Sequence, residues 1–413
     1  MLQKLYGQHS QFLARCKGGG RLPNEASGVE EPVEFSIPPH AAEFREEVRA
    51  FFAEAYPAQL RGRRFERPHD RAFFKAVSRW QQEHLANRDA YEVTVFYQEA
   101  ARWGIDLTNY APTRMIAETL DQVGTERQKA EFVPHLRDGD YLIALGLTEP
   151  EAGSDLASAR TRAVRDGDQW IINGQKIYTS NAQHATHVFL LTRTNLEVPK
   201  HKGLTVFLVP IDAPGVEVRP VHTLAYHHTN MTFYTDVPVP DWYRVGEADG
   251  GWDIMKVALS REQSGEGSTD LGELVRQATL WAEEADGPGG SRTIDDPAVR
   301  ERIARAAIDL EVASLLAQRS AWATANGVPK DPGWGPGSKL FETEAYARAA
   351  AGFFSMVGPA AVIPFEEQGS VSGGWFNYCF RDSPVRLIGG GVSEVMREII
   401  AERRLGLPRT RPK

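Results

Sequence analysis

The amino-acid sequence predicts an α+β protein in which helical domains flank a central β-domain. Three observations predict this class. Apolar residues recur at helical spacing in the first third of the chain, and helical spacing returns after Trp252. Between these stretches, β-branched and aromatic runs alternate with Gly, Pro and Asn turns, which is typical of a β-sandwich or barrel. The expected parts are an N-terminal extension (1–38), a helical domain (39–140), a β-domain (141–245) and a helical bundle (246–413).

The N-terminal part is expected to begin with a mobile extension, because residues 1–38 have three glycines at 18–20 and no sustained hydrophobic period. The first helix is predicted where Phe44, Val48 and Phe52 fall on one helical face. Four further helices are predicted at residues 70–85, 91–103, 114–123 and 126–136. These segments together predict the N-terminal helical domain.

The β-domain is expected to open with a hairpin. Residues 169–172 and 176–179 are rich in β-branched and aromatic residues, and Asn173-Gly174 between them is a typical hairpin turn. Further strands are predicted at residues 188–192, 204–209, 216–221 and 231–237.

The C-terminal part is again predicted to be helical, with breaks at the Gly- and Pro-rich residues 287–290 and 331–337. A long helix is predicted over residues 296–325, because D-D-P at 295–297 combines a capping residue with a first-turn proline. A last helix is predicted over residues 393–402.

The composition is that of an ordinary globular protein, with 42% hydrophobic and 25% charged residues among 413. A net charge of −8 argues against a nucleic-acid-binding surface, which would need a basic excess. Cys16 and Cys379 do not support a disulfide framework, and no metal site is expected. No apolar run reaches the roughly 18 residues of a membrane helix, so we expect a cytoplasmic protein.

The most informative stretch is residues 144–182. Its first part, L-T-E-P-E-A-G-S-D at 147–155, is a polar loop that offers hydrogen-bond donors to a ligand. Tyr178 and Thr179 follow a predicted strand and could stack on, and hydrogen-bond to, a planar ring. On residue type alone, a core tyrosine beside an ordinary strand threonine is the commoner explanation.

The two ends of this stretch together resemble the central signature of the acyl-CoA dehydrogenase family, L-T-E-P-x-A-G-S-D followed by N-G-x-K-x-aromatic-T-S-N-A. The resemblance covers about residues 41–408 and includes G-T-E-R-Q-K at 124–129. It implies the family's fold with a C-terminal four-helix bundle, FAD as cofactor, and α,β-dehydrogenation of an acyl-CoA thioester.

The resemblance also implies roles for single residues. The backbone of Leu147 and Thr148 would bond the pyrimidine side of the flavin ring, Ser154 would lie near the phosphates, and Thr179 would reach the flavin N5 region. Tyr178 stands where the family usually has Trp, and its ring can still stack. The expected cofactor-binding residues are Leu147, Thr148, Gly153, Ser154, Tyr178, Thr179, Ser180, Gly390, Gly391, Ser393 and Glu394.

The expected catalytic base is Glu262. This chemistry needs a carboxylate that removes the α-proton while the flavin accepts a hydride from the β-carbon. The family carries the carboxylate at one of two positions, and this chain has Gly390 at the near-C-terminal one. The other position corresponds by resemblance to Glu262, although composition alone favours an ordinary surface glutamate there. Gln263 replaces an arginine that commonly follows the base.

The glycine run at 389–391 is a place where backbone N–H groups can meet an anion, or simply a tight packing turn. The resemblance favours a cofactor-side role. Val392 replaces the family's usual threonine and removes a hydroxyl.

Two elements that make contacts across subunits in the family are missing. They are an R-x-x-F-G segment within 275–299, which reaches a neighbouring subunit's flavin diphosphate, and the Gln and second Gly of a stretch at 356–360. Some actinobacterial members, including those that act on sterol side chains, pair unlike subunits, and V-H-T-L-A at 221–225 resembles that group. The expected partners are an acyl-CoA substrate, an electron-transfer flavoprotein or similar acceptor, and a homo- or hetero-tetramer with a second acyl-CoA dehydrogenase-like chain. The alternatives are a non-catalytic or half-site partner subunit, and an acyl-CoA oxidase or flavin monooxygenase.

Overall fold

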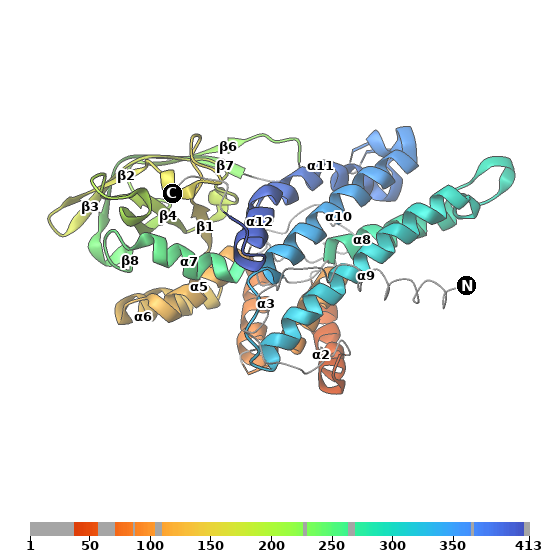
Figure 1. Ribbon diagram of the computed structural model, residues 1–413, viewed down its shortest axis with the longest axis horizontal. Coiled ribbons are helices and arrows are strands. Elements are labelled where there is room, and N and C mark those ends of the chain that lie inside the picture. Colours follow the sequence, from red (N-terminus) through yellow and green to blue (C-terminus); the bar gives the residue numbers. More distant parts are fainter. Residues whose placement is uncertain are drawn as a thin grey trace. The chain divides into compact units, whose positions relative to one another are not determined.

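The computed structural model describes residues 37–56, 71–85, 87–103, 110–225, 229–262, 269–364 and 367–408. The predicted extension lies outside these ranges except for its last two residues. Along the described chain, helices come first, a sheet follows, and helices return (Figure 1). This is the α+β architecture that the sequence predicts, and the domain boundaries within it stay a prediction.

The first helices share a core of aromatic side chains. They are α2 (Pro39–Ala55), α3 (Arg71–His84) and α4 (Ala90–Arg102). Phe44 and Phe52 of α2 are buried with Phe96 of α4, and Trp80 of α3 stacks on Phe44 and on Phe96. The helical spacing of apolar residues therefore predicted the buried face of α2 correctly.

The next helices, α5 (Ala111–Val123) and α6 (Glu126–Arg137), pack against the sheet. Helix α6 begins with a capping box, in which Thr125 Oγ1 accepts from the Gln128 N–H at 3.2 Å and Gln128 Oε1 accepts from the Thr125 N–H at 3.0 Å. The same Gln128 side chain donates to the carbonyls of Trp242 and Arg244, at 2.9 and 2.7 Å. This residue thus both starts the helix and ties it to the end of the β-region.

The central sheet has the strand order β6-β7-β3-β2-β4-β5-β8, with β1 paired to β4. The strands are β1 (Ile143–Gly146), β2 (Arg162–Asp166), β3 (Gln169–Lys176), β4 (His187–Arg193), β5 (Leu204–Pro210), β6 (Val216–Val221), β7 (Thr229–Pro240) and β8 (Arg244–Val245). Strands β2 and β4 pair only at Arg162 and Arg193. Trp170 of β3 packs on Phe207 of β5, with 5.5 Å between the centres of the two rings. The two halves of the sheet therefore face each other, as in the predicted sandwich.

The predicted hairpin at Asn173-Gly174 is wrong. Strand β3 runs unbroken through these residues, and the hairpin turn is Gly167-Asp168, between β2 and β3. Asn173 instead faces a bulge in β7, where Thr235 and Asp236 lie between the pairs Ile172–Val237 and Gly174–Tyr234. Two hydrogen bonds between Asn173 and Asp236, of 3.0 and 2.9 Å, hold this bulge.

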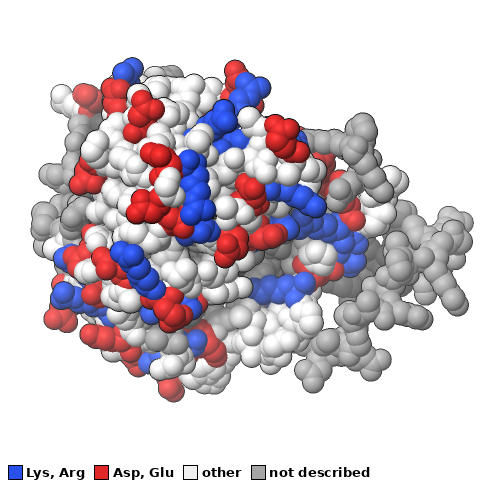
Figure 2. Space-filling model, turned by 90° about the vertical axis from the view of Figure 1, so that its left-hand side faces the viewer, with Lys and Arg blue, Asp and Glu red and all other residues white. Residues whose placement is uncertain are grey.

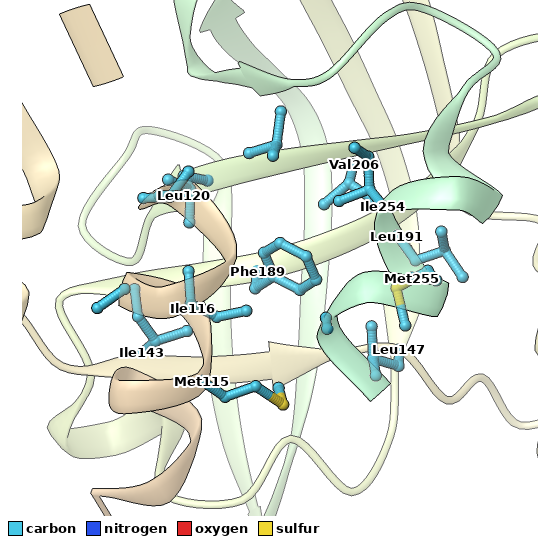
Figure 3. Packing of buried hydrophobic residues seen from close by; sticks show 14 of the residues in the cluster. Met115, Ile116, Leu120, Ile143, Leu147, Phe189, Leu191, Val206, Ile254 and Met255 are labelled. Atoms are coloured by element: carbon cyan, nitrogen blue, oxygen red, sulfur yellow. The ribbon is translucent and has the colours of Figure 1, made fainter. Parts of the chain in front are cut away.

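A second core joins the sheet to helices on either side of it in the sequence (Figure 3). Met115 and Ile116 of α5 lie against Phe189 of β4, and Ile254 and Met255 of the first helix after the sheet pack onto the same apolar face. The loop that follows β1 is therefore anchored next to a closely packed interior.

The C-terminal helices are α7 (Gly251–Glu262), α8 (Thr269–Glu284), α9 (Pro297–Ala325), α10 (Trp334–Val357), α11 (Trp375–Ile388) and α12 (Ser393–Ile399). Buried residues from α8, α9, α10 and α11, such as Leu274, Ala306, Phe353 and Phe376, form one core, which agrees with the expected four-helix bundle. Helix α9 starts as predicted, because Asp296 Oδ1 accepts from the Ala298 N–H at 2.8 Å.

The last predicted helix, over residues 393–402, is α-helical only in its first part. Helix α12 ends at Ile399, and residues Ile400–Arg404 form a π-helical turn closed by the Leu405 N–H to the Ile400 carbonyl at 3.1 Å. Across the described helices, none combines the length and the apolar character that a membrane crossing requires.

Candidate functional site

The loop after β1 is fastened to the end of β3. The Ile177 N–H donates to the Thr148 carbonyl at 2.9 Å, as a strand neighbour would. Lys176 Nζ donates to the Leu147 carbonyl at 3.2 Å and to Glu149 Oε1 at 2.7 Å. Lys176, the last residue of β3, and Ile177, which follows it, thus fix three consecutive loop residues in one conformation.

The Lys176–Glu149 ion pair is enclosed by protein, with side-chain exposures of 0% and 6%. Glu149 also accepts from the backbone N–H groups of Arg160 and Thr161, at 2.7 and 2.8 Å. Burial lowers the pKa of Lys176 to about 8, although the charge of Glu149 opposes this shift. Burial tends to raise the pKa of Glu149, but the Lys176 charge and these hydrogen bonds lower it on balance.

Sequence reasoning assigned no role to Lys176 or Glu149, although both lie within the motifs that it used. A signal was present in β3. Trp170 and Ile172 are buried core residues, and the two-residue period of a strand places Lys176 on the same side. A lysine in that phase needs a buried acidic partner.

Tyr178 projects its ring outward from the end of this strand. Its side chain is exposed, at 59%, and its backbone has φ 59°, in the left-handed region that aromatic residues rarely occupy. The core tyrosine that residue type alone favours is therefore excluded. An exposed ring on a fixed backbone can stack on a planar ligand.

The two hydroxyl residues after Tyr178 point differently. Thr179 is fully buried, with its N–H bonded to the Asn230 carbonyl at 2.9 Å and its hydroxyl 3.3 Å from that of Thr232. Ser180 is only half-buried, and its hydroxyl donates to Thr229 Oγ1 at 3.3 Å. Of the two, Ser180 is the residue that an external ligand can reach.

The rest of the polar loop offers surface to a ligand. Thr148 is half-buried, while Gly153 and Ser154 are exposed. A Cβ placed on Gly153 would meet no atom within 4 Å, so nothing in the protein crowds this part of the loop. The structure therefore holds Leu147 and Thr148 against Lys176 and Ile177, directly before the exposed Tyr178.

The glycine run after α11 is a tight turn with left-handed backbone at Gly390 (φ 68°) and Gly391 (φ 104°). Lys339 of α10 donates to the Gly391 carbonyl at 2.5 Å. Ser393 is 8% exposed, and its hydroxyl has no hydrogen-bond partner in the described part of the chain. An orphaned buried hydroxyl marks a position for a polar ligand atom.

A cavity of about 500 Å³ adjoins this turn between α10, α11 and α12. It is lined by Glu344, Ala347, Arg348, Leu387, Ile388, Val392, Ser393, Glu394 and Arg397. Arg397 pairs with Glu344 at 2.6 Å, and Arg348 pairs with Asp309 at 3.2 Å. The lining thus holds two paired guanidinium groups, the carboxylates of Glu344 and Glu394, and Ser393, and this mixed set can both donate to and accept from a polar ligand.

Glu262 is the last residue of α7, and its side chain, like Gln263, lies outside the described residues. Its predicted catalytic role therefore stays a prediction. Residue 390, at the alternative position that the resemblance implies, is a glycine and has no side-chain carboxylate.

A cluster of charged side chains that sequence reasoning missed lies inside the C-terminal bundle. Arg386 of α11 is 2.5 Å from Asp270 of α8 and 2.9 Å from Asp382, and its guanidinium lies 5.5 Å from the centre of the Tyr346 ring. Burial, followed by the charge of Asp270, raises the pKa of nearby Glu342 to about 7. The D-x-x-x-R spacing of Asp382 and Arg386 on one helix was the available signal.

Among the described residues, His40, Asp89 and Glu92 are close enough to share a metal ion. Their atoms are already engaged at the start of α4, where Asp89 Oδ1 accepts from the Tyr91 and Glu92 N–H groups and Asp89 Oδ2 lies 2.7 Å from His40 Nε2. We interpret this group as a helix cap.

The surface in Figure 2 mixes basic and acidic side chains without a region of one sign. Exposed ion pairs such as Arg219–Glu217 and Lys256–Asp253, both at 2.7 Å, are typical of the described chain. Such pairs add little to stability.

Comparison with known proteins gives two matching family models, the middle domain of acyl-CoA dehydrogenase at residues 144–237 and the acyl-CoA dehydrogenase C-terminal domain at residues 249–405. The acyl-CoA dehydrogenase FadE26 of Mycobacterium tuberculosis is 36% identical over 330 residues, which are 78% of this chain and 82% of that protein. The acyl-CoA dehydrogenase IpdE1 of the same organism is 35% identical over 340 residues, 80% of this chain and 84% of that protein.

Two solved structures are similar over most of the chain. One is the ChsE4-ChsE5 complex from Mycobacterium tuberculosis, with a TM-score of 0.81, 33% identity, and 91% of this chain and 100% of that chain covered. The other is the Tcur3481-Tcur3483 steroid ACAD, with a TM-score of 0.83, 32% identity and the same coverage.

Proposed function

The chain belongs to the acyl-CoA dehydrogenase family of FAD-dependent enzymes, and from that premise we propose that Glu262 is its catalytic base. The Glu262 carboxylate removes the α-proton of an acyl-CoA thioester, and a hydride leaves the β-carbon. When bound, FAD supplies the hydride acceptor. The position of Glu262 at the end of α7, together with the glycine at the alternative position, supports this assignment.

The described residues fit a flavin. The exposed Tyr178 ring would stack on the flavin ring, and the Leu147 and Thr148 backbone would meet its pyrimidine side. Because Thr179 is buried, we assign the hydroxyl near flavin N5 to Ser180 instead. The diphosphate would lie toward Ser154 at one end and toward the glycine turn at the other.

The glycine turn would supply the second half of the cofactor site. Gly390 and Gly391 present backbone N–H groups in left-handed conformation, and the unpartnered Ser393 hydroxyl lies in the neighbouring cavity. Glu394 lines this cavity with a negative charge, so we expect it to accept hydrogen bonds from the cofactor's hydroxyls rather than to meet its phosphates.

The observation that carries the flavin site is the outward Tyr178 ring beside a loop held in one conformation. Its test is an FAD titration of the wild type, Tyr178→Ala and Tyr178→Trp. The alanine variant should bind FAD about tenfold more weakly and the tryptophan variant as tightly as the wild type, because stacking needs an aromatic face. Equal affinity in all three proteins would remove Tyr178 from the site.

We further propose that the chain works in a tetramer with a second acyl-CoA dehydrogenase-like chain and passes electrons to an electron-transfer flavoprotein or similar carrier in the cytoplasm. The similarity to the ChsE4-ChsE5 complex and the missing R-x-x-F-G segment support an unlike partner. The similarity to a steroid ACAD favours a sterol-derived acyl group. The parts proposed for the chain, 39–140, 141–245 and 246–413, follow the change from helix to sheet to helix.

The competing assignments have separate tests. A visible spectrum of the purified chain, alone and after mixing with a candidate partner chain, distinguishes self-sufficient from shared FAD binding. A half-site subunit becomes yellow only in the mixture. Hydrogen peroxide formed in proportion to substrate, without a carrier, identifies an oxidase.

A further inference from the structure

We propose that Lys176 is a positioning residue for the flavin, which fixes and polarises the peptide bond between Leu147 and Thr148 that the flavin ring meets. This inference rests on the proposed function only in taking residues 147–148 as part of the flavin site. Lys176 itself is fully buried and does not touch the ligand surface.

Stability gives no sufficient reason for an enclosed lysine at this position. Removing an ammonium group from water costs several kcal/mol, and well-packed apolar residues in place of a buried ion pair are often neutral or stabilising. Lys176 nevertheless lies in phase with the core residues Trp170 and Ile172, where an apolar residue would fit the pattern. Its contacts therefore point to a role in setting the loop conformation.

The contacts of Lys176 act on one peptide unit. Its Nζ donates to the Leu147 carbonyl at 3.2 Å, and all described peptide bonds are trans, so the Thr148 N–H points away from Lys176. A positive charge at the carbonyl oxygen polarises this amide and makes the N–H on its other side a stronger donor. The Thr148 carbonyl is meanwhile held by the Ile177 N–H at 2.9 Å.

Glu149 supplies the opposing charge and a second attachment. It bonds Lys176 at 2.7 Å and the N–H groups of Arg160 and Thr161. Arg193 is the other charged group that faces Lys176, and it donates to the Ala159 carbonyl at 3.2 Å. Asp249 faces Arg193 in turn, so the total charge of this group falls by one when Lys176 loses its proton.

A protonated Lys176 favours the reduced cofactor, which carries more negative charge than the oxidised one. Burial lowers the pKa of Lys176 to about 8, so the charge is lost within an accessible pH range. The reduction potential of bound FAD should therefore change its pH dependence near pH 8. Glu149 does not change its charge near pH 8, because its pKa is lowered. Arg193 stays charged as well, because a guanidinium keeps its proton even though burial lowers its pKa.

The test compares Lys176→Met and Glu149→Gln with the wild type. Each protein is measured in the form that retains FAD, either alone or with its partner chain. Lys176→Met should bind FAD about tenfold more weakly, shift the reduction potential to a more negative value, and lose the change near pH 8. Glu149→Gln should keep that change but move it to lower pH, because Lys176 loses its counter-charge. Lys256→Met, on the exposed face of α7, is the control and should match the wild type.

The outcomes separate this inference from the proposed function. If Lys176→Met melts at a lower temperature but keeps the wild-type potential and pH profile, Lys176 is only structural. If Lys176→Met does not fold, an unchanged pH profile in Glu149→Gln also overturns the inference. If the wild type holds no FAD under any condition, the flavin site itself is wrong.

Discussion

Arg386 and Asp270 lie 2.5 Å apart and join the last turn of α11 to the first turn of α8. Arg386 comes four residues before Gly390, and Asp270 comes eight residues after Glu262. This ion pair therefore connects the two segments that contain the two possible positions of the catalytic base. The Asp382 carboxylate, which is 1% exposed, forms a second ion pair with the same guanidinium, with 2.9 Å between Arg386 Nε and Asp382 Oδ2.

We expect Arg386→Met to destabilise the protein by about 3 kcal/mol, because it leaves the buried Asp382 carboxylate without its counter-charge. Chemical denaturation of the wild type and the variant measures this difference. The matched control is Arg305→Met, which removes an exposed ion pair with Glu301 and should change stability by less than about 0.5 kcal/mol. Equal effects of the two substitutions would show that the cluster does not stabilise the bundle.

Gly174→Ala should be strongly destabilising, by about 2 kcal/mol or more. Its backbone has φ 147°, and a Cβ there would lie 2.7 Å from the Cα of Thr161. Gly337→Ala is the contrast, since a Cβ at this position in α10 meets nothing within 4 Å, and it should stabilise by up to about 1 kcal/mol. Thermal melts of both variants test this difference in sign, and a tolerated alanine at 174 would show that the bulge is not rigid.

We expect the protein to lose stability in mild acid because of the buried His187. Burial lowers its pKa to about 4, against an opposing effect of Asp212, and its ring packs on Phe132 and Tyr141. Between pH 6.5 and 4 the unfolded chain binds a proton at this residue and the folded protein does not. The free energy of unfolding should therefore fall by up to about 3 kcal/mol as the pH falls through this window.

Denaturant titrations at pH 7 and pH 4.5 measure the effect of His187. His187→Phe keeps an aromatic ring in the core and should show a smaller loss between these two pH values than the wild type. The exposed His201 provides the control, and His201→Phe should keep the wild-type dependence. A pH dependence that is the same in all three proteins would show that other groups cause it.

Local patterns predicted the helices because their information lies in neighbouring residues. The spacing of Phe44, Val48 and Phe52 identified α2, and the Asp296-Pro297 pair identified the start of α9. The false hairpin has a non-local cause. Asp-Gly at 166–167 and Asn-Gly at 173–174 lie within eight residues of each other. The bonds of Asn173 to Asp236, in the bulge of β7, keep the Asn-Gly pair inside a continuous strand.

The candidate site was predicted in outline and missed in detail for the same reason. The motifs identified the loop and Tyr178, but the left-handed backbone of Tyr178 decides which of Thr179 and Ser180 faces outward. The Lys176–Glu149 contact joins residues far apart in the sequence. No local spacing shows such a contact.

Glu262 is proposed to remove the α-proton, and rapid mixing of Glu262→Gln with an acyl-CoA tests this role most directly. The acyl-CoA used in this experiment is the one that the wild type converts fastest in a screen of short, long, branched and sterol-derived acyl-CoAs. With FAD retained, flavin reduction should slow by about 100- to 10,000-fold, while Glu247→Gln, 95% exposed, reacts like the wild type. Reduction of the flavin in Glu262→Gln at the wild-type rate would exclude Glu262 as the base.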